Sequence, residues 1–115
     1  MWLVYLARFF AGVFLANAIP HFVSGTQGRP FPSPFASPPG RGDSSPAVNV
    51  LWGAANAGVG YVLLYRVGNF AMTHSLEVLV AGLGGLLMSV QLASHFGQVY
   101  LEKTGAIEGS TVGLH

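Results

Sequence analysis

Apolar residues along this chain are concentrated in three long runs, at residues 2–23, 47–65 and 75–96. They form continuous blocks rather than the alternating or amphipathic spacing of a water-soluble domain. A helix rises about 1.5 Å per residue, so about 20 residues cross a hydrocarbon layer roughly 30 Å thick. The pattern therefore predicts an all-α integral membrane protein with three transmembrane helices.

The connection between the first two runs, residues 24–46, holds six of the seven prolines of the chain. Proline lacks an amide proton and fixes its own φ angle, so we expect a long proline-rich loop rather than a helix or a central strand. Ser45 followed by Pro46 predicts the start of the second helix, because serine caps a free amide and proline suits the first helical position. Thr73 or Ser75 can cap the third helix in the same way.

The three helices are expected to form a single domain over residues 1–115, with a polar tail at residues 97–115. Successive crossings place the proline-rich loop and the tail at the same end of the helices, which we call the loop end. The N-terminus and the short connection between the second and third helices lie at the opposite end, called the turn end.

Composition supports the membrane prediction. Charged residues make up 8% of the chain and hydrophobic residues 51%, whereas an ordinary soluble domain has about 25% charged residues. A net charge of +1 without a basic cluster makes nucleic acid an unsuitable partner. The absence of cysteine excludes disulfides and thiolate metal sites. The expected partners are the lipid bilayer and other membrane subunits or further copies of this chain.

Small and amide side chains recur on one stripe of the second helix, at Asn49, Gly53, Asn56 and Gly60. The third helix has a matching stripe that includes Ala81, Gly84 and Met88. Small residues let helices approach closely, and buried amides hydrogen-bond across the contact. We therefore expect both stripes to pack against other helices, and we interpret them as contact surfaces for assembly. The alternative is that the amides line a polar cavity or pathway.

Polar side chains from all three runs fall near the loop end, at Asn17, His21, Asn49, Gln91 and His95. Residues four apart share a helix face, so these groups can gather beneath the loop. Imidazole binds metals and carries protons near neutral pH, which makes the cluster a candidate site for a small solute, an ion or a lipid-like molecule. A hydrogen-bonded histidine at a helix interface is the favoured interpretation. Two histidines without a carboxylate or thiolate do not complete a zinc site, so no metal and no cofactor is expected.

The proline-rich loop carries apolar side chains that suit a contact, namely Phe31, Pro32, Pro34 and Phe35. Polyproline II and turns are the natural conformations of such a segment. We expect these four residues to face the bilayer or a partner subunit.

Arg8 lies within the first apolar run, only a few residues from its start. The favoured interpretation is that its long stem carries the charge to the membrane boundary, where Trp2 and Tyr5 add an aromatic anchor. The alternative is an ion pair with Glu77 at the turn end.

Two short segments resemble known membrane proteins. Residues 29–46 followed by Ala47-Val48-Asn49-Val50-Leu51-Trp52-Gly53 resemble small uncharacterised bacterial integral membrane proteins. The segment Arg8-Phe9-Phe10-Ala11-Gly12-Val13-Phe14 is similar to the first helix of the DoxX-type four-helix proteins, whereas this chain has three apolar runs. These resemblances imply a bacterial inner (plasma) membrane location and supply no catalytic residues.

No nucleophile with a base and an orienting group, no carboxylate pair and no phosphate-binding glycine loop is evident in the sequence. The predicted function is therefore a non-catalytic small membrane protein, acting as an accessory or structural subunit of a homo-oligomer or a larger complex. The alternative is binding or transport of a small solute, ion or lipid-like ligand through the loop-end polar cluster.

Overall fold

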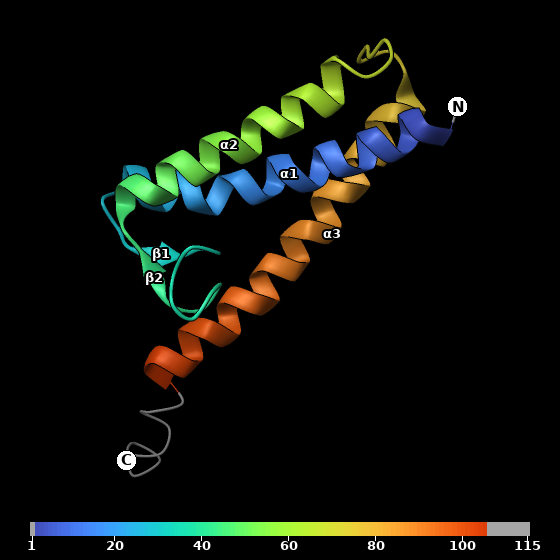
Figure 1. Cartoon of the computed structure of the whole chain (residues 1–115). Coiled ribbons are helices and arrows are strands. Elements are labelled where there is room, and N and C mark those ends of the chain that lie inside the picture. Colours follow the sequence, from blue (N-terminus) through green and yellow to red (C-terminus); the bar gives the residue numbers. More distant parts are fainter. Residues whose placement is uncertain (1, 106–115) are drawn as a thin grey trace.

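The computed structural model of this chain describes residues 2–105 and is mostly helical (Figure 1). Its elements, in chain order, are α1 (Trp2–Thr26), β1 (Phe31–Pro32), β2 (Asp43–Ser44), α2 (Pro46–Tyr65), α3 (Ser75–Tyr100) and the π-helical segment η1 (Leu101–Gly105). All three α-helices are long and apolar enough to cross a membrane, which confirms the prediction to this extent.

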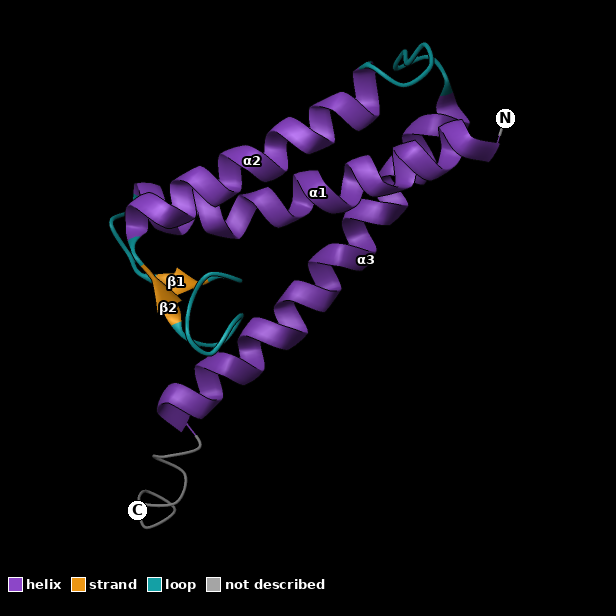
Figure 2. Ribbon diagram, viewed as in Figure 1, coloured by secondary structure: helices purple, strands orange, loops and turns teal. Residues whose placement is uncertain are grey.

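The first helix is the centre of the fold. It packs along both α2 and α3, whereas α2 and α3 do not pack along one another. Figure 1 shows α3 leaning away from α2 toward its C-terminal end, so that the helices form an open V. The loop between α1 and α2 lies in the mouth of this V, with its short β1–β2 ladder beside α3 (Figure 2).

Close helix contacts depend on glycine. A Cβ atom built on Gly53 of α2 would lie 2.8 Å from the backbone nitrogen of Phe22. One built on Gly60 would lie 2.6 Å from Cγ of Leu15. On α3, Gly84 lies directly against the backbone of Phe9. The small residues of both stripes therefore let α2 and α3 approach α1 to nearly backbone distance.

The loop contains a short ladder and leads into α2 through the capping residues expected from the sequence. Ser45 caps α2 by accepting a hydrogen bond from the backbone N–H of Val48 at 3.2 Å, and Pro46 occupies the first helical position, as predicted. Within the loop, Phe31 pairs with Ser44 in a two-residue antiparallel ladder.

The third helix differs from its prediction at both ends. His74 occupies the N-cap position without a side-chain cap, so neither Thr73 nor Ser75 fills that role. At the other end, helical structure continues through residues 97–105, where the sequence predicts a polar tail. Val99, which is buried, extends the packed face of the helix beyond residue 96. The remainder of the predicted tail, residues 106–115, lies outside the described residues.

At the turn end, Arg8 joins all three helices. Its Nε donates to Oε1 of Glu77 at 2.6 Å, and its Nη1 donates to the carbonyl oxygen of Leu63 at 2.9 Å. The guanidinium group also lies 5.3 Å from the ring centre of Phe70. Arg8 is fully buried, so the interpretation of Arg8 as a boundary anchor is wrong and the Glu77 pair is present. The reason is that the start of α3 brings a carboxylate against α1.

Candidate functional site

The loop end is organised around a buried hydrogen bond between α1 and α2. His21 Nδ1 lies 2.8 Å from Oδ1 of Asn49, and these residues are 2% and 0% exposed. The Asn49 Nδ2 group donates to the carbonyl oxygens of Phe31, Ser44 and Ser45 at 2.9, 3.3 and 3.2 Å. Because the amide nitrogen faces carbonyls, Oδ1 is the acceptor and His21 donates from Nδ1. Asn49 thus holds both flanks of the proline-rich loop to the helices.

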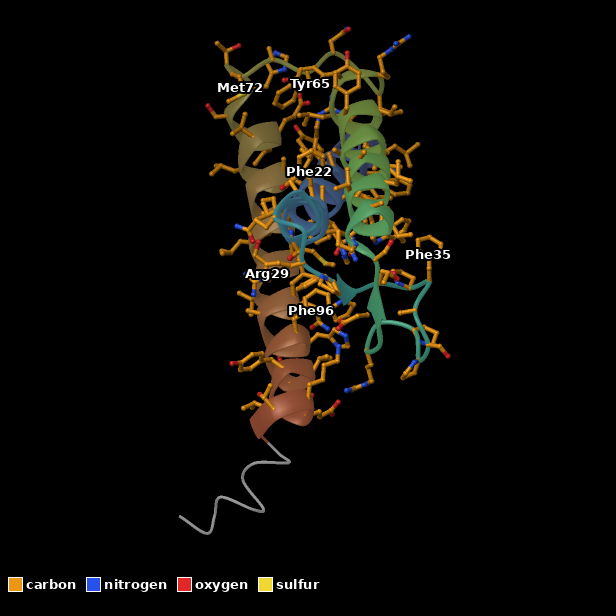
Figure 3. All side chains as sticks on the ribbon, turned by 90° about the vertical axis from the view of Figure 1, so that its left-hand side faces the viewer. Phe22, Arg29, Phe35, Tyr65, Met72 and Phe96 are labelled. Carbon is orange, nitrogen blue, oxygen red and sulfur yellow. The ribbon has the colours of Figure 1, made fainter. Side chains whose placement is uncertain are left out.

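Aromatic rings enclose the imidazole of His21. The ring centres of Phe31, Phe96 and Trp52 lie 5.5, 6.0 and 6.4 Å away, each approaching edge-on. Phe31 and Phe96 also contact each other at 4.7 Å. Figure 3 shows Phe96 on the side of α3 that meets the loop, and Phe35 at the outer edge of the loop. These contacts join α1, α2, α3 and the loop in one apolar cluster.

The outer part of the loop is fastened to the end of α3 and to η1. His95 Nε2 lies 2.8 Å from the carbonyl oxygen of Gly40. Lys103 Nζ pairs with Asp43 Oδ1 at 2.7 Å, and Arg41 pairs with Glu102. Both ion pairs are partly exposed, so each contributes about 1 kcal/mol or less to stability. Their effect is to fix where the loop lies.

A cavity of about 180 Å³ separates the loop from α3. Its walls are mostly apolar, with one ion pair at the edge. The lining residues are Pro30, Phe31, Pro32, Asp43, Phe96, Val99, Tyr100 and Lys103. The cavity shares Phe31 and Phe96 with the enclosure of His21, so the hydrogen-bonded core and the cavity form one site at the loop end.

The five predicted cluster residues do not form a single cluster. His21 pairs with Asn49, whereas Asn17 Nδ2 donates to Oδ1 of Asn56 at 2.9 Å in a separate contact. His95 contacts the loop instead. Gln91 is exposed and has no side-chain hydrogen bond within residues 2–105. On α1 and α2, Asn17 faces Asn56 rather than Asn49, and on α3 the side chain of His95 meets the loop while Gln91 stays exposed.

The predicted packing residues are used inside the chain. Asn49, Gly53, Asn56 and Gly60 are buried, and the glycines face α1. On α3, Gly84 is buried against α1 and Met88 is half-buried. The backbone carbonyl of Ala81 lies so close to Gly12 of α1 that a Cβ atom on Gly12 would overlap it. The interpretation of these stripes as surfaces for assembly with other subunits is therefore corrected, since the partner helix is α1 of the same chain.

The four loop residues predicted to face a partner divide into two pairs. Phe31 packs against His21 and Phe96, and Pro32 is buried, so this pair points inward. Pro34 and Phe35 point outward and are exposed, and the inner edge of the Phe35 ring packs against Trp52 of α2, with the ring centres 5.1 Å apart.

Sequence reasoning missed the aromatic enclosure and the ion pairs of the loop. Arg41 and Asp43 in the loop face Glu102 and Lys103 near the chain end, which is a complementary arrangement of charge at one end of the molecule. That complementarity is readable in the sequence once the loop and the end of α3 are placed together. Within the described residues, no group of three or more histidine, cysteine or acidic side chains is arranged to hold a metal ion.

Comparison with known proteins finds no matching family model, no matching curated protein and no matching solved structure. The functional argument therefore depends on the geometry of the loop end. Its hydrogen bonds hold the loop, its cavity is apolar, and its outer edge displays an exposed phenylalanine.

Proposed function

We propose that this chain is a non-catalytic integral membrane protein of the bacterial inner membrane, and that it works as an accessory or structural subunit whose loop contacts a partner subunit. The observation that supports this most is the display of Phe35, which is 65% exposed at the edge of a loop fastened on both sides. Pro34 and Pro38 are exposed beside it.

The anchoring of the loop favours recognition. Asn49 fixes the flanks of the loop, and Gly40, Arg41 and Asp43 fasten its outer part to α3 and η1. A segment that is already ordered loses little conformational entropy when it binds. Large aromatic side chains are enriched at the centres of interfaces, and Phe35 is presented in this way. The polar groups of the loop end thus act mainly by shaping a surface.

Replacing Phe35 with alanine is expected to reduce the amount of partner subunit that copurifies from native membranes by about tenfold, as for the loss of a central interface aromatic. Quantitative mass spectrometry of the complex, isolated in mild detergent, measures this. Phe10→Ala is the matched control, because Phe10 is also exposed but lies on the first half of α1. Equal recovery of the partner with Phe35→Ala and wild-type chains would contradict the proposal.

A second candidate function, binding of a small lipid-like ligand, is favoured by the cavity between the loop and α3. Its apolar walls suit a hydrocarbon group, and Lys103 and Asp43 at its edge suit a polar one. In this function His21 and Asn49 hold the wall of the cavity in place rather than contacting the ligand directly.

Filling the cavity tests this second function. Val99 is 3% exposed and lines the cavity, so Val99→Phe is expected to remove the bound lipid-like molecule from the purified protein, as seen by native mass spectrometry. Val90→Phe is the control, since Val90 is exposed on the same helix. Identical lipid content in both variants would exclude the cavity as the binding site.

A further inference from the structure

The cavity between the loop and α3 has one charged edge, formed by Lys103 and Asp43. Lys103 Nζ donates to Oδ1 of Asp43 at 2.7 Å, and both side chains are partly exposed. A lysine ammonium has three N–H groups and a carboxylate has two oxygens. Within residues 2–105 this is the one hydrogen bond that either side chain makes, so the edge offers a ligand both donors and an acceptor.

The other walls of the cavity are apolar side chains of the loop and of α3, among them Phe31, Pro32, Phe96 and Val99. The cavity volume is about 180 Å³. Pockets that enclose a whole drug-sized molecule have volumes of about 300–1,000 Å³. This cavity is therefore of a size to hold one end of a larger molecule, with a charged group at its edge and an apolar part against its walls.

The cavity lies where the apolar part of α3 gives way to charge. Phe96 ends the third apolar run, and Glu102 and Lys103 are the first acidic and basic residues of the chain after Glu77. Phe96 and Lys103 are seven residues apart, which is about 10 Å along a helix. In the proposed membrane location, the walls of the cavity therefore run from the end of the hydrocarbon into the headgroup layer.

We propose that this cavity binds the headgroup end of a zwitterionic aminophospholipid, with the lipid phosphate at Lys103 and its primary ammonium at Asp43. The inference rests on the second candidate function, the binding of a lipid-like ligand. Lys103 keeps its bond to Asp43 and donates a second N–H to a phosphate oxygen, while the lipid ammonium donates to Oδ2 of Asp43. The glycerol and the first methylene groups lie against the apolar walls, and the rest of the acyl chains stays in the bilayer.

Charge complementarity selects this headgroup over the other common ones. The cavity edge carries one positive and one negative side chain, and the neighbouring pair of Arg41 and Glu102 is balanced in the same way. An anionic phosphatidylglycerol headgroup brings no cation to Asp43 and places its own charge beside the carboxylate. Phosphatidylcholine has a cation without any N–H, so it cannot donate a hydrogen bond to Asp43. Phosphatidylethanolamine satisfies both groups of the edge.

The full chain, reconstituted into liposomes of equal parts phosphatidylethanolamine, phosphatidylcholine and phosphatidylglycerol, provides the test. After extraction in mild detergent, native mass spectrometry measures how much of each lipid stays bound. We expect the wild-type chain to retain about five times more phosphatidylethanolamine than either other lipid, as for one partly exposed charge contact. Equal retention of the three lipids would overturn the proposal.

Asp43→Asn is expected to reduce the preference for phosphatidylethanolamine over phosphatidylglycerol by about fivefold, because the carboxylate then neither attracts the ammonium nor repels the anion. Glu102→Gln is the matched control. It removes one carboxylate from the other partly exposed ion pair between the loop and η1, but Glu102 does not line the cavity. Equal loss of preference in both variants would contradict recognition by Asp43.

Lys103→Gln tests the phosphate contact. All three lipids carry a phosphate, so their retention is expected to fall to a similar extent. A loss confined to phosphatidylethanolamine would show that Lys103 does not hold the phosphate and would overturn the arrangement.

Failure of this inference is distinguishable from failure of the function on which it rests. If Val99→Phe removes bound lipid but the wild-type chain shows no preference among the three lipids, the cavity binds lipid and the assigned headgroup is wrong. If the wild-type chain retains no lipid, both proposals fall. Phe35→Ala is expected to leave lipid retention unchanged, because Phe35 does not line this cavity.

Discussion

Replacing Glu77 with alanine is expected to lower the free energy of unfolding by about 3–5 kcal/mol, the range for breaking one side of a buried ion pair. Arg8 is fully buried and pairs with Glu77 at 2.6 Å, while its Nη1 is held by the carbonyl oxygen of Leu63. Removing the carboxylate leaves a buried positive charge without a counter-charge. Equilibrium unfolding in mixed detergent micelles measures the change.

The effect should come from the uncompensated charge, and two controls test this. Arg8→Leu combined with Glu77→Leu removes both charges and is expected to be more stable than Glu77→Ala alone. Glu102→Ala breaks the partly exposed pair with Arg41 and is expected to cost about 1 kcal/mol or less. If Glu77→Ala and Glu102→Ala prove equally mild, the turn-end pair does not stabilise the fold in the way described.

The second large effect is expected for Gly53→Leu on α2. A Cβ on Gly53 would lie 2.8 and 2.9 Å from the backbone nitrogen and Cβ of Phe22, closer than real Cβ contacts come. Leucine adds three further carbon atoms to this contact, so α2 must move away from α1. We expect a loss of about 3 kcal/mol, the upper part of the usual range for overpacking.

Gly58→Leu is the matched control for this prediction. Gly58 lies on the same helix, but a Cβ built there meets nothing within 4 Å. The same substitution should therefore change the unfolding free energy by less than about 0.5 kcal/mol, as at surfaces without special contacts. Comparable destabilisation by both variants would show that glycine is needed in α2 for another reason than its approach to α1.

The helices were predictable because their signal is local. A run of about 20 apolar residues is long enough to cross a hydrocarbon layer as a helix, and this can be recognised without knowing how the rest of the chain folds. The start of α2 was predictable for the same reason, since Ser45 and Pro46 act on the backbone next to them. The proline-rich composition likewise showed where α1 and α2 are joined by a loop.

The partners of each helix face were not predictable. The spacing of Gly53 and Gly60 identifies a face made for close approach, but it does not say whether the approaching helix belongs to the same chain. The same limit applies to Gln91, which shares a stripe with buried Gly84 yet is exposed. The difference arises because α3 crosses α1 near Gly84 and then leans away, and an inclination between helices is a property of the whole assembly.

Asn49 holds the loop in place, a role that its position in the sequence does not indicate. Asn49 was expected to contribute to a polar cluster, and it does contact His21. Its amide nitrogen, however, also contacts the carbonyl oxygen of Phe31, 18 residues earlier in the chain, and those of Ser44 and Ser45 just before α2, so these contacts depend on where the loop folds back. Hydrophobic pattern and proline content carry no information on that return path.

The position of Arg8 also has a consequence for biosynthesis. Chains emerge from the ribosome N-terminus first, so under the proposed membrane location α1 is available for insertion while Glu77 is still 69 residues behind Arg8. Until the third helix arrives, an arginine in a lone helix is drawn to the aqueous boundary. Synthesis of α3 delivers the counter-charge and allows α1 to settle between its two neighbours. In the proposed membrane location, the helix that is made first thus reaches its final depth only after the helix that is made last has been synthesised.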